Sequence, residues 1–176
     1  GGSAAARLSI ESEKTREHVE KLGQFLQWHG ALTLDFIRTD GHFYYIECNP
    51  RMVEPANAYK AGVNFPKIMI ELANGCYSKS DVSVGQAGVG THSLMALLIG
   101  TAERTKSRKK IVRTMRKWLF NSDSEEVLTP IWKDPLSFIP LAIIIGRLLI
   151  NPRSVTKLVD KTVKHYSLEP TTQKNI

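Results

Sequence analysis

Cysteine is scarce in this sequence, which has only Cys48 and Cys76 among its 176 residues. Two cysteines exclude a disulfide framework, and they exclude a zinc site built from clustered cysteines. The histidines lack the spacing of metal ligands, so we assign no role to His18, His29, His42, His92 or His165. We therefore expect a reducing, cytoplasmic setting.

Signals for export and for membrane insertion are also lacking. The chain opens with Gly1-Gly-Ser and three alanines, without the basic start and apolar run of a secretory signal, so we expect a segment of a longer protein. The run from Phe138 to Ile150 is apolar, but it is short for a membrane span and contains Pro140 and Arg147. It predicts a buried helix and no transmembrane span.

Positive charge is concentrated in one segment. Eight basic residues and one acid between Glu103 and Lys117 give +7, which equals the net charge of the whole chain. The rest of the chain therefore sums to zero, and basicity is a local feature. The basic residues are Arg104, Lys106, Arg108, Lys109, Lys110, Arg113, Arg116 and Lys117.

The N-terminal part has the pattern of a strand followed by a helix. Residues 7–10 form a short strand-like run, and Ser12 suits the N-cap of a following helix. Apolar residues at helical spacing predict this helix over 14–28, and Gly30 suits a left-handed stop after its last turn.

A β-hairpin is predicted next. Two strand-like runs, 32–38 and 43–48, flank Asp40-Gly41, and Asp-Gly between such runs is a strong hairpin signal. Two turns remain open at this point. One is a two-residue Asp40-Gly41 turn, and the other is a three-residue loop that includes His42.

The second half of the chain has a helical texture. Pro66 opens a helix to about Ala73 after an irregular stretch over 50–64, and the polar, glycine-rich residues 79–90 indicate a loop or boundary. An apolar helix is predicted around 94–99, and the basic segment continues as a helix through Phe120. Its apolar stripe consists of Ile111, Val112, Met115, Trp118 and Leu119.

The turn decides whether the hairpin builds a site. With an odd loop, Asp35 lies directly opposite Glu47, and Asn49 lies diagonally beyond on the same face. A two-residue turn is expected to put Asp35 and Glu47 on opposite faces, so that no site forms. Two opposed acids in a partly desolvated site repel by on the order of a few kcal/mol.

A divalent cation offsets such repulsion. Mg²⁺ prefers carboxylate and carbonyl oxygens and keeps positions for water and phosphate, so Asp35, Glu47 and Asn49 form a candidate metal site. Arg51 adds a guanidinium suited to phosphate or acyl-phosphate oxygens. The alternative is that each acid is an ordinary solvated side chain and that Asn49-Pro50 only starts a turn.

These residues resemble the signature of ATP-grasp enzymes, whose best-known relatives are carbamoyl-phosphate synthetase and biotin carboxylase. The resemblance lies in Gly30-Ala-Leu-Thr-Leu-Asp-Phe-Ile37, in Asp40-Gly41 and in Tyr45-Ile-Glu-Cys-Asn-Pro-Arg51. It covers residues 7–75, and its specific part is 30–66. It implies an α+β fold, the C-terminal part of an ATP-grasp domain with an antiparallel sheet and packed helices, followed by a helical appendage.

The resemblance also implies roles for individual residues. Asp35, Glu47 and Asn49 correspond to the family's ligands for the Mg²⁺ (or Mn²⁺) ions that bridge ATP phosphates. Arg51 corresponds to the residue that binds phosphate or the activated carboxyl. Glu54 stands where biotin carboxylase-like members place a catalytic acid or base, but its surroundings diverge, and an exposed loop acid is the favoured interpretation.

The function implied is that of an ATP- and magnesium-dependent ligase, which activates a carboxylate as an acyl phosphate for attack by an amine or other nucleophile. The family's central subdomain, which contacts adenine and supplies phosphate-binding lysines, is expected elsewhere in the same protein. The domains expected are a C-terminal ATP-grasp subdomain over 1–78, a loop over 79–90, a helical appendage over 91–166 and a polar tail over 167–176.

Two rival functions remain open. The basic segment 104–117 beside its apolar stripe is typical of a module that binds anionic membrane or nucleic acid, with the apolar run after Pro135 strengthening membrane attachment. The favoured alternative for that helix is packing by its stripe with its charges in water. The chain as a catalytically incomplete structural fragment is the other rival.

Overall fold

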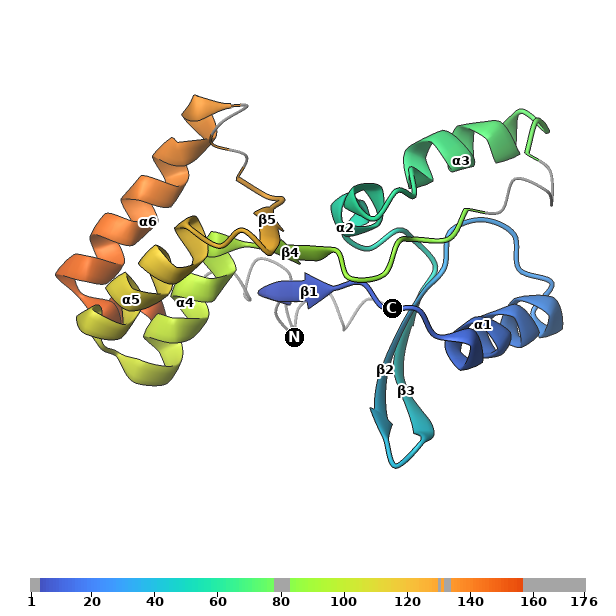
Figure 1. Ribbon diagram of the computed structural model, residues 1–176, viewed down its shortest axis with the longest axis horizontal. Helices are drawn as coiled ribbons and strands as arrows, with labels where there is room; N and C mark the ends of the chain where they lie inside the picture. Colours follow the sequence, from blue (N-terminus) through green and yellow to red (C-terminus); the bar gives the residue numbers. More distant parts are fainter. Residues whose placement is uncertain (1–3, 78–82, 130, 132–133, 157–176) are drawn as a thin grey trace, which may run out of the picture. The chain divides into compact units, whose positions relative to one another are not determined.

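The computed structural model describes residues 4–77, 83–129, 131 and 134–156, and it has a mixed α+β fold. The chain divides into two compact units. The hairpin unit comprises Leu8–Val89, and the helical unit comprises the described residues up to Arg7 together with those from Gly90 onward. Figure 1 shows the elements of each unit. The domain boundaries expected from the sequence stay a prediction.

In the hairpin unit, the predicted N-terminal helix is confirmed as α1 (Glu13–Phe25). The Ser12 hydroxyl accepts a hydrogen bond from the backbone N–H of Thr15 at 3.4 Å, as an N-cap does. The helix ends before the predicted 14–28 span is complete, because Gln27 already has a positive φ of 49°. Gly30 has φ 102° and lies in the connection to the hairpin.

The predicted hairpin is confirmed as antiparallel β2 (Thr33–Thr39) and β3 (His42–Asn49). Two helices follow, α2 (Pro55–Lys60) and α3 (Phe65–Ala73). The sequence predicted α3 but read α2 as irregular chain. Asn64 caps α3 by accepting a hydrogen bond from the N–H of Lys67 at 3.1 Å.

Apart from Leu8, the last residue of β1, the helical unit contains a three-stranded sheet in the order β1–β4–β5. The strands are β1 (Ala6–Leu8), β4 (Gly90–His92) and β5 (Ser124–Glu126), and β4 and β5 are parallel. Antiparallel pairing is confirmed in the hairpin, whereas the segment expected as a helical appendage also contains β4 and β5, which pair in parallel. Strands of three residues carry too little alternation to be read from sequence, and β4 and β5 were not predicted.

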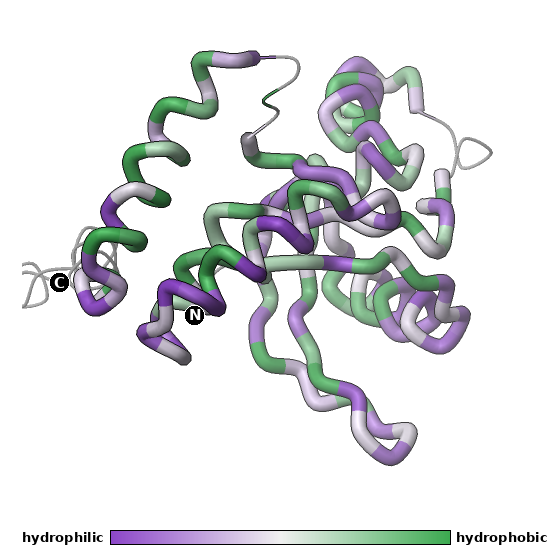
Figure 2. Tube along the Cα trace, turned by 60° about the vertical axis from the view of Figure 1, so that its left-hand side comes forward, coloured by the Kyte–Doolittle hydropathy of each residue, from purple (hydrophilic) through white to green (hydrophobic). Residues whose placement is uncertain are grey.

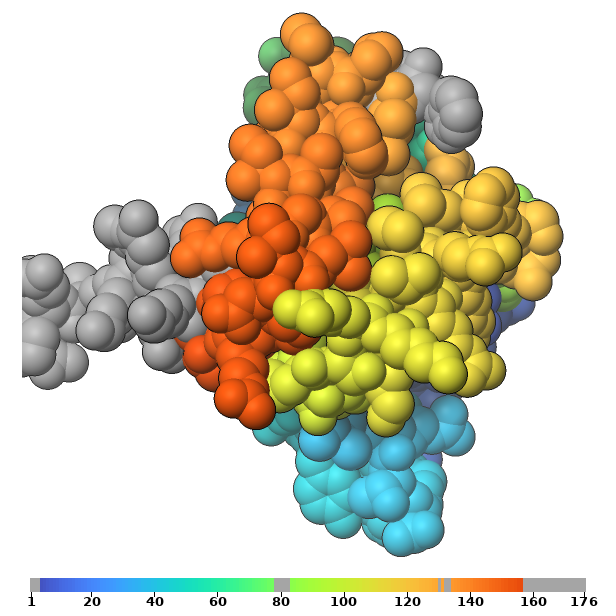
Figure 3. All heavy atoms as spheres, turned by 90° about the vertical axis from the view of Figure 1, so that its left-hand side faces the viewer, coloured from blue at the N-terminus to red at the C-terminus, as the bar shows by residue number. Residues whose placement is uncertain are grey.

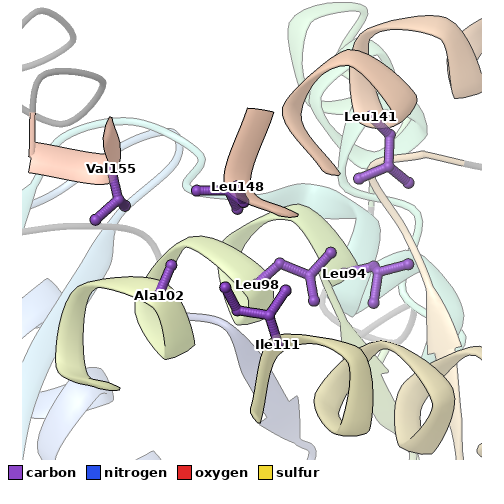
Figure 4. Packing of buried hydrophobic residues seen from close by; sticks show 7 residues of the cluster. All are labelled: Leu94, Leu98, Ala102, Ile111, Leu141, Leu148 and Val155. Atoms are coloured by element: carbon purple, nitrogen blue, oxygen red, sulfur yellow. The ribbon is translucent and has the colours of Figure 1, made fainter. Parts of the chain in front are cut away.

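Three helices cover one core in this unit. They are α4 (Leu94–Thr105), α5 (Arg108–Leu119) and α6 (Phe138–Ile150), with short 3₁₀ turns at Pro135–Ser137 and Pro152–Ser154. Figure 4 shows the buried side chains that meet between these helices. They are Leu94, Leu98, Ala102, Ile111, Leu141, Leu148 and Val155.

Burial is distributed unequally between the units. Ala61 and Val63 are the buried hydrophobic residues of the hairpin unit among the described residues, whereas the helical unit has the seven of the core cluster. Phe25, Ile46 and Ile70 of the hairpin unit are exposed. Across the described residues, no helix combines the length and the apolarity needed to cross a membrane.

Candidate functional site

The hairpin turn has two residues. Thr39 pairs with His42, and the residues between them have φ values of 50° at Asp40 and 77° at Gly41. Asp-Gly with two positive φ values matches the twist of the flanking strands. The amine of Lys14 on α1 donates to the Gly41 carbonyl at 3.0 Å and holds the turn against the helix. The prediction of a three-residue loop that includes His42 is therefore wrong.

A β-bulge nevertheless places the two acids opposite each other. Phe36 pairs with Tyr45, whereas Asp35 pairs with Glu47, so Ile46 is an extra residue in β3. Directly opposed residues of an antiparallel pair project from the same face. The expectation that a two-residue turn separates Asp35 from Glu47 is wrong, because it assumed a ladder without a bulge.

The third oxygen ligand lies on the same face. Asn49 pairs with Thr33, two residues from Asp35 along β2, and the side-chain period of a strand is two. Asn49 is half-buried, whereas Asp35 and Glu47 are exposed. The partly desolvated setting expected for the acids is therefore wrong. Their repulsion is of the smaller size typical of opposed surface charges, roughly 0.2–1 kcal/mol.

Arg51 and Glu54 follow the end of β3. The Thr33 hydroxyl donates to the Arg51 backbone carbonyl at 3.0 Å, which ties this residue to the start of β2, and its side chain is exposed. Glu54 is half-buried at the N-cap of α2 with φ 48°. Its interpretation as an exposed loop acid is wrong, since α2 begins directly after it.

Aromatic rings cluster between α1 and the hairpin. Ring centroids of Phe36 and Phe43 lie 5.1 Å apart, and those of His18 and Phe43 lie 4.6 Å apart. The Tyr45 hydroxyl is 2.8 Å from Nδ1 of His18. An open pocket of about 670 Å³ adjoins this cluster, and Glu47 is on its border. Its lining is His18, Lys21, Leu22, Phe25, Leu34, Tyr45, Ile46, Glu47 and Cys48.

The donor set is compatible with a hard cation and less so with a soft one. The described residues contain no group of three or more His, Cys, Asp or Glu side chains placed to hold a metal ion. The hairpin face instead offers two carboxylates and an amide on neighbouring ladder positions. Mg²⁺ binds proteins through a few such oxygens and completes its octahedron with water and phosphate oxygens.

No protein-family model, curated protein or solved structure matches this chain. The geometry of the hairpin is therefore the structural observation that bears on function.

Sequence reasoning missed a polar cluster in the helical unit. His92 is 5% exposed, its Nδ1 lies 2.9 Å from the Ser124 hydroxyl, and its ring packs on Trp118 with centroids 4.9 Å apart. The Glu126 carboxylate accepts from the N–H of Leu94 at 2.6 Å. Burial lowers the pKa of His92, and the charge of Glu126 partly opposes this effect. The signal available was the period-two spacing of Ser124 and Glu126.

Proposed function

We propose that the hairpin unit is the metal-binding part of an ATP-grasp carboxylate ligase. The observation that carries the proposal is the bulge at Ile46, which brings Asp35 directly opposite Glu47 with Asn49 on the same face. A regular ladder after this turn would separate the acids. The bulge places two like charges opposite each other, which lowers stability. A cation that binds both carboxylates offsets this cost, so the bulge favours a metal-binding role.

In this proposal, Asp35, Glu47 and Asn49 hold Mg²⁺ or Mn²⁺ bound to ATP. The metal supplies charge neutralisation at the phosphate oxygens when bound. Arg51 binds a phosphate or the activated carboxyl through its guanidinium. Glu54 acts as an acid or base at the start of α2. The substrates are a small carboxylate and an amine or other nucleophile, joined through an acyl phosphate.

A second part of the same protein completes the nucleotide site. The ATP-grasp resemblance implies a further subdomain that contacts adenine and the phosphates. The hairpin unit has room for it, because Phe25, Ile46 and the pocket they line are exposed beside Glu47. We also infer a cytoplasmic setting, since Cys48 and Cys76 are both free and exposed, as thiols in a reducing compartment are.

The experiment titrates Mn²⁺ into the chain in the presence of ATP. Calorimetry and electron spin resonance measure the metal binding. We expect Glu47→Gln and Asp35→Asn each to reduce Mn²⁺ binding at least about tenfold, because loss of one charged oxygen ligand removes a large share of the affinity. Asp40→Asn is the matched control. It removes a carboxylate from the same hairpin, and Asn-Gly keeps the turn type.

Two results would reject the proposal. One is Mn²⁺ binding that the Asp35 and Glu47 substitutions leave unchanged, which would place the metal elsewhere. The other is absence of metal-dependent ATP binding in the longest natural form of the protein, which would favour a catalytically incomplete structural role for the hairpin.

A further inference from the structure

An isoleucine stripe lies on the solvent side of α6. Ile139, Ile143 and Ile150 are 53%, 65% and 76% exposed. Their spacing of four and seven residues places them on one face, because a helix turns once every 3.6 residues. Leu141 and Leu148 on the other side are fully buried. Figure 2 shows hydrophobic residues along α6. The sequence predicted a buried helix, and only one side of α6 is buried.

A group of cations surrounds the connection between α4 and α5. Arg104 is in the last turn of α4, and Lys106 follows at its C-cap. Lys109 and Lys110 are in the first turn of α5. All are exposed, and no carboxylate in the described part of the chain forms an ion pair with them. We call these four residues the basic corner.

The basic corner adjoins the C-terminal end of the isoleucine stripe. The Arg108 guanidinium, at the start of α5, donates to the backbone carbonyl of Ile150 at 2.6 Å. Leu98, Ile111 and Leu148 also join the three helices in one core. Figure 3 shows the turn between α4 and α5 against the end of α6. Arg147, exposed in the last turn of α6, adds a cation beside the stripe.

We propose that the isoleucine stripe and the basic corner bind the surface of an anionic membrane. Lipid headgroups supply the negative charge that the corner lacks among the residues the structure describes, and the acyl boundary accepts the isoleucines. This inference is independent of the metal site, since all its residues belong to the helical unit.

The charge of the basic corner and the apolar surface of the isoleucine stripe together favour a lipid surface over nucleic acid or a second copy of the chain. Aliphatic side chains gain little on a phosphate backbone, so nucleic acid leaves the isoleucines unexplained. A second copy docked on the same face brings one basic corner against another, which repels. A lipid surface satisfies both features at once.

The first experiment measures sedimentation of the chain with vesicles of phosphatidylcholine alone or mixed with phosphatidylglycerol. We expect binding to the mixed vesicles only, weakening as salt is raised. Ile143→Ser should reduce partitioning roughly fivefold to tenfold, because a large aliphatic surface no longer enters the bilayer boundary. Lys109→Gln should reduce it roughly fivefold, the value of one cation near an anionic surface.

The hairpin unit supplies matched controls on α3. Ile70→Ser changes a helical isoleucine that is 62% exposed, close to the 65% of Ile143. Lys67→Gln removes an exposed helical lysine. Both should leave partitioning unchanged. Circular dichroism confirms that each variant folds.

A second measurement covers the case in which Ile143→Ser fails to fold. Ile143→Cys, in a background with Cys48→Ser and Cys76→Ser, takes an environment-sensitive fluorophore. Its emission should shift to the blue with anionic vesicles, whereas the same label at Ile70→Cys should not shift.

Several outcomes would overturn the membrane proposal. These are equal binding to neutral vesicles, an unshifted label at position 143, binding to duplex DNA or RNA in place of vesicles, and a dimer in solution that Ile143→Ser dissociates. None of them alters the expected Mn²⁺ titration of the hairpin unit, so failure of one proposal is distinguishable from failure of the other.

Discussion

Ile46 shows how one residue decides the candidate site. The hydrophobic pattern of β3 gives no sign that this residue is extra, because Tyr45, Ile46 and Cys48 all suit a strand. The identities of Asp35, Glu47 and Asn49 were predicted from the sequence and its resemblance. Their shared face depends on a bulge that only the pairing of the strands reveals.

His92 shows a second residue that spacing did not reveal. Its contacts with Ser124, Glu126 and Trp118 come from residues more than 20 positions away in sequence. In the sequence, His92 lacks ligand-like spacing just as the other histidines do. Burial separates His92 from His18, His29 and His42, and burial is a tertiary property.

The lowered pKa of His92 makes stability depend on pH. Its folded pKa lies below the ordinary value of 6.5, so the unfolded chain binds the proton more readily. This contribution to the free energy of unfolding is complete above about pH 6.5 and decreases as the pH falls through the folded pKa. Urea unfolding at several values from about pH 7.5 to about pH 5 measures this pH dependence, with each free energy of unfolding extrapolated linearly to zero urea.

His92→Asn is the comparison for this prediction. Asparagine keeps a polar group near the Ser124 hydroxyl but does not titrate. The difference in unfolding free energy between wild type and variant should therefore narrow as the pH falls. A difference that stays constant across this range would show that His92 does not contribute through its protonation.

At the scale of elements, local signals predicted the helices and the hairpin better than the short strands. Ser12 caps α1 and Asn64 caps α3, and both caps act within three residues. The hairpin of β2 and β3 forms around Asp40-Gly41 as predicted, and strand pairing selects the two-residue turn that the sequence left open. By contrast, β4 pairs with β5 across about 30 residues, and three-residue strands show no period.

The repulsion between Asp35 and Glu47 is expected to lower the stability of the hairpin in the absence of metal. Asp35→Asn should raise the free energy of unfolding in chelator by roughly 0.2–1 kcal/mol, because it removes repulsion across the strands. Added Mn²⁺ with ATP should then stabilise the wild type more than the variant, because the variant binds the metal more weakly. Thermal unfolding with and without metal measures both effects, and a variant less stable in chelator contradicts the first.

At the scale of the whole molecule, burial divides the chain into two units of unequal core. The fully buried side chains Leu98, Ile111 and Leu148 belong to the helical unit. The hairpin unit buries Ala61 and Val63 and leaves larger apolar residues in solvent. A unit with so little core is expected to be marginally stable by itself.

Leu98→Ala should therefore lower the stability of the helical unit and leave the hairpin unit largely unchanged. Removing a fully buried leucine costs about 2–5 kcal/mol in similar cores. We expect amide exchange to accelerate in α4, α5 and α6 and to change little in α1 and the hairpin. Hydrogen exchange read by mass spectrometry measures this, and a uniform increase along the chain would mean that the units unfold together.

The sequence by itself determined most of the helices, the presence of a hairpin around Asp40-Gly41 and the chemical character of the candidate residues, because caps, periodicity and Asp-Gly act over a few neighbouring residues. It left the length of the hairpin turn open and missed α2. Only the tertiary structure decided the face shared by Asp35 and Glu47, the burial of His92 and the exposed side of α6. Each of these depends on which distant segment packs alongside, and that choice is made by pairing and burial across the whole chain.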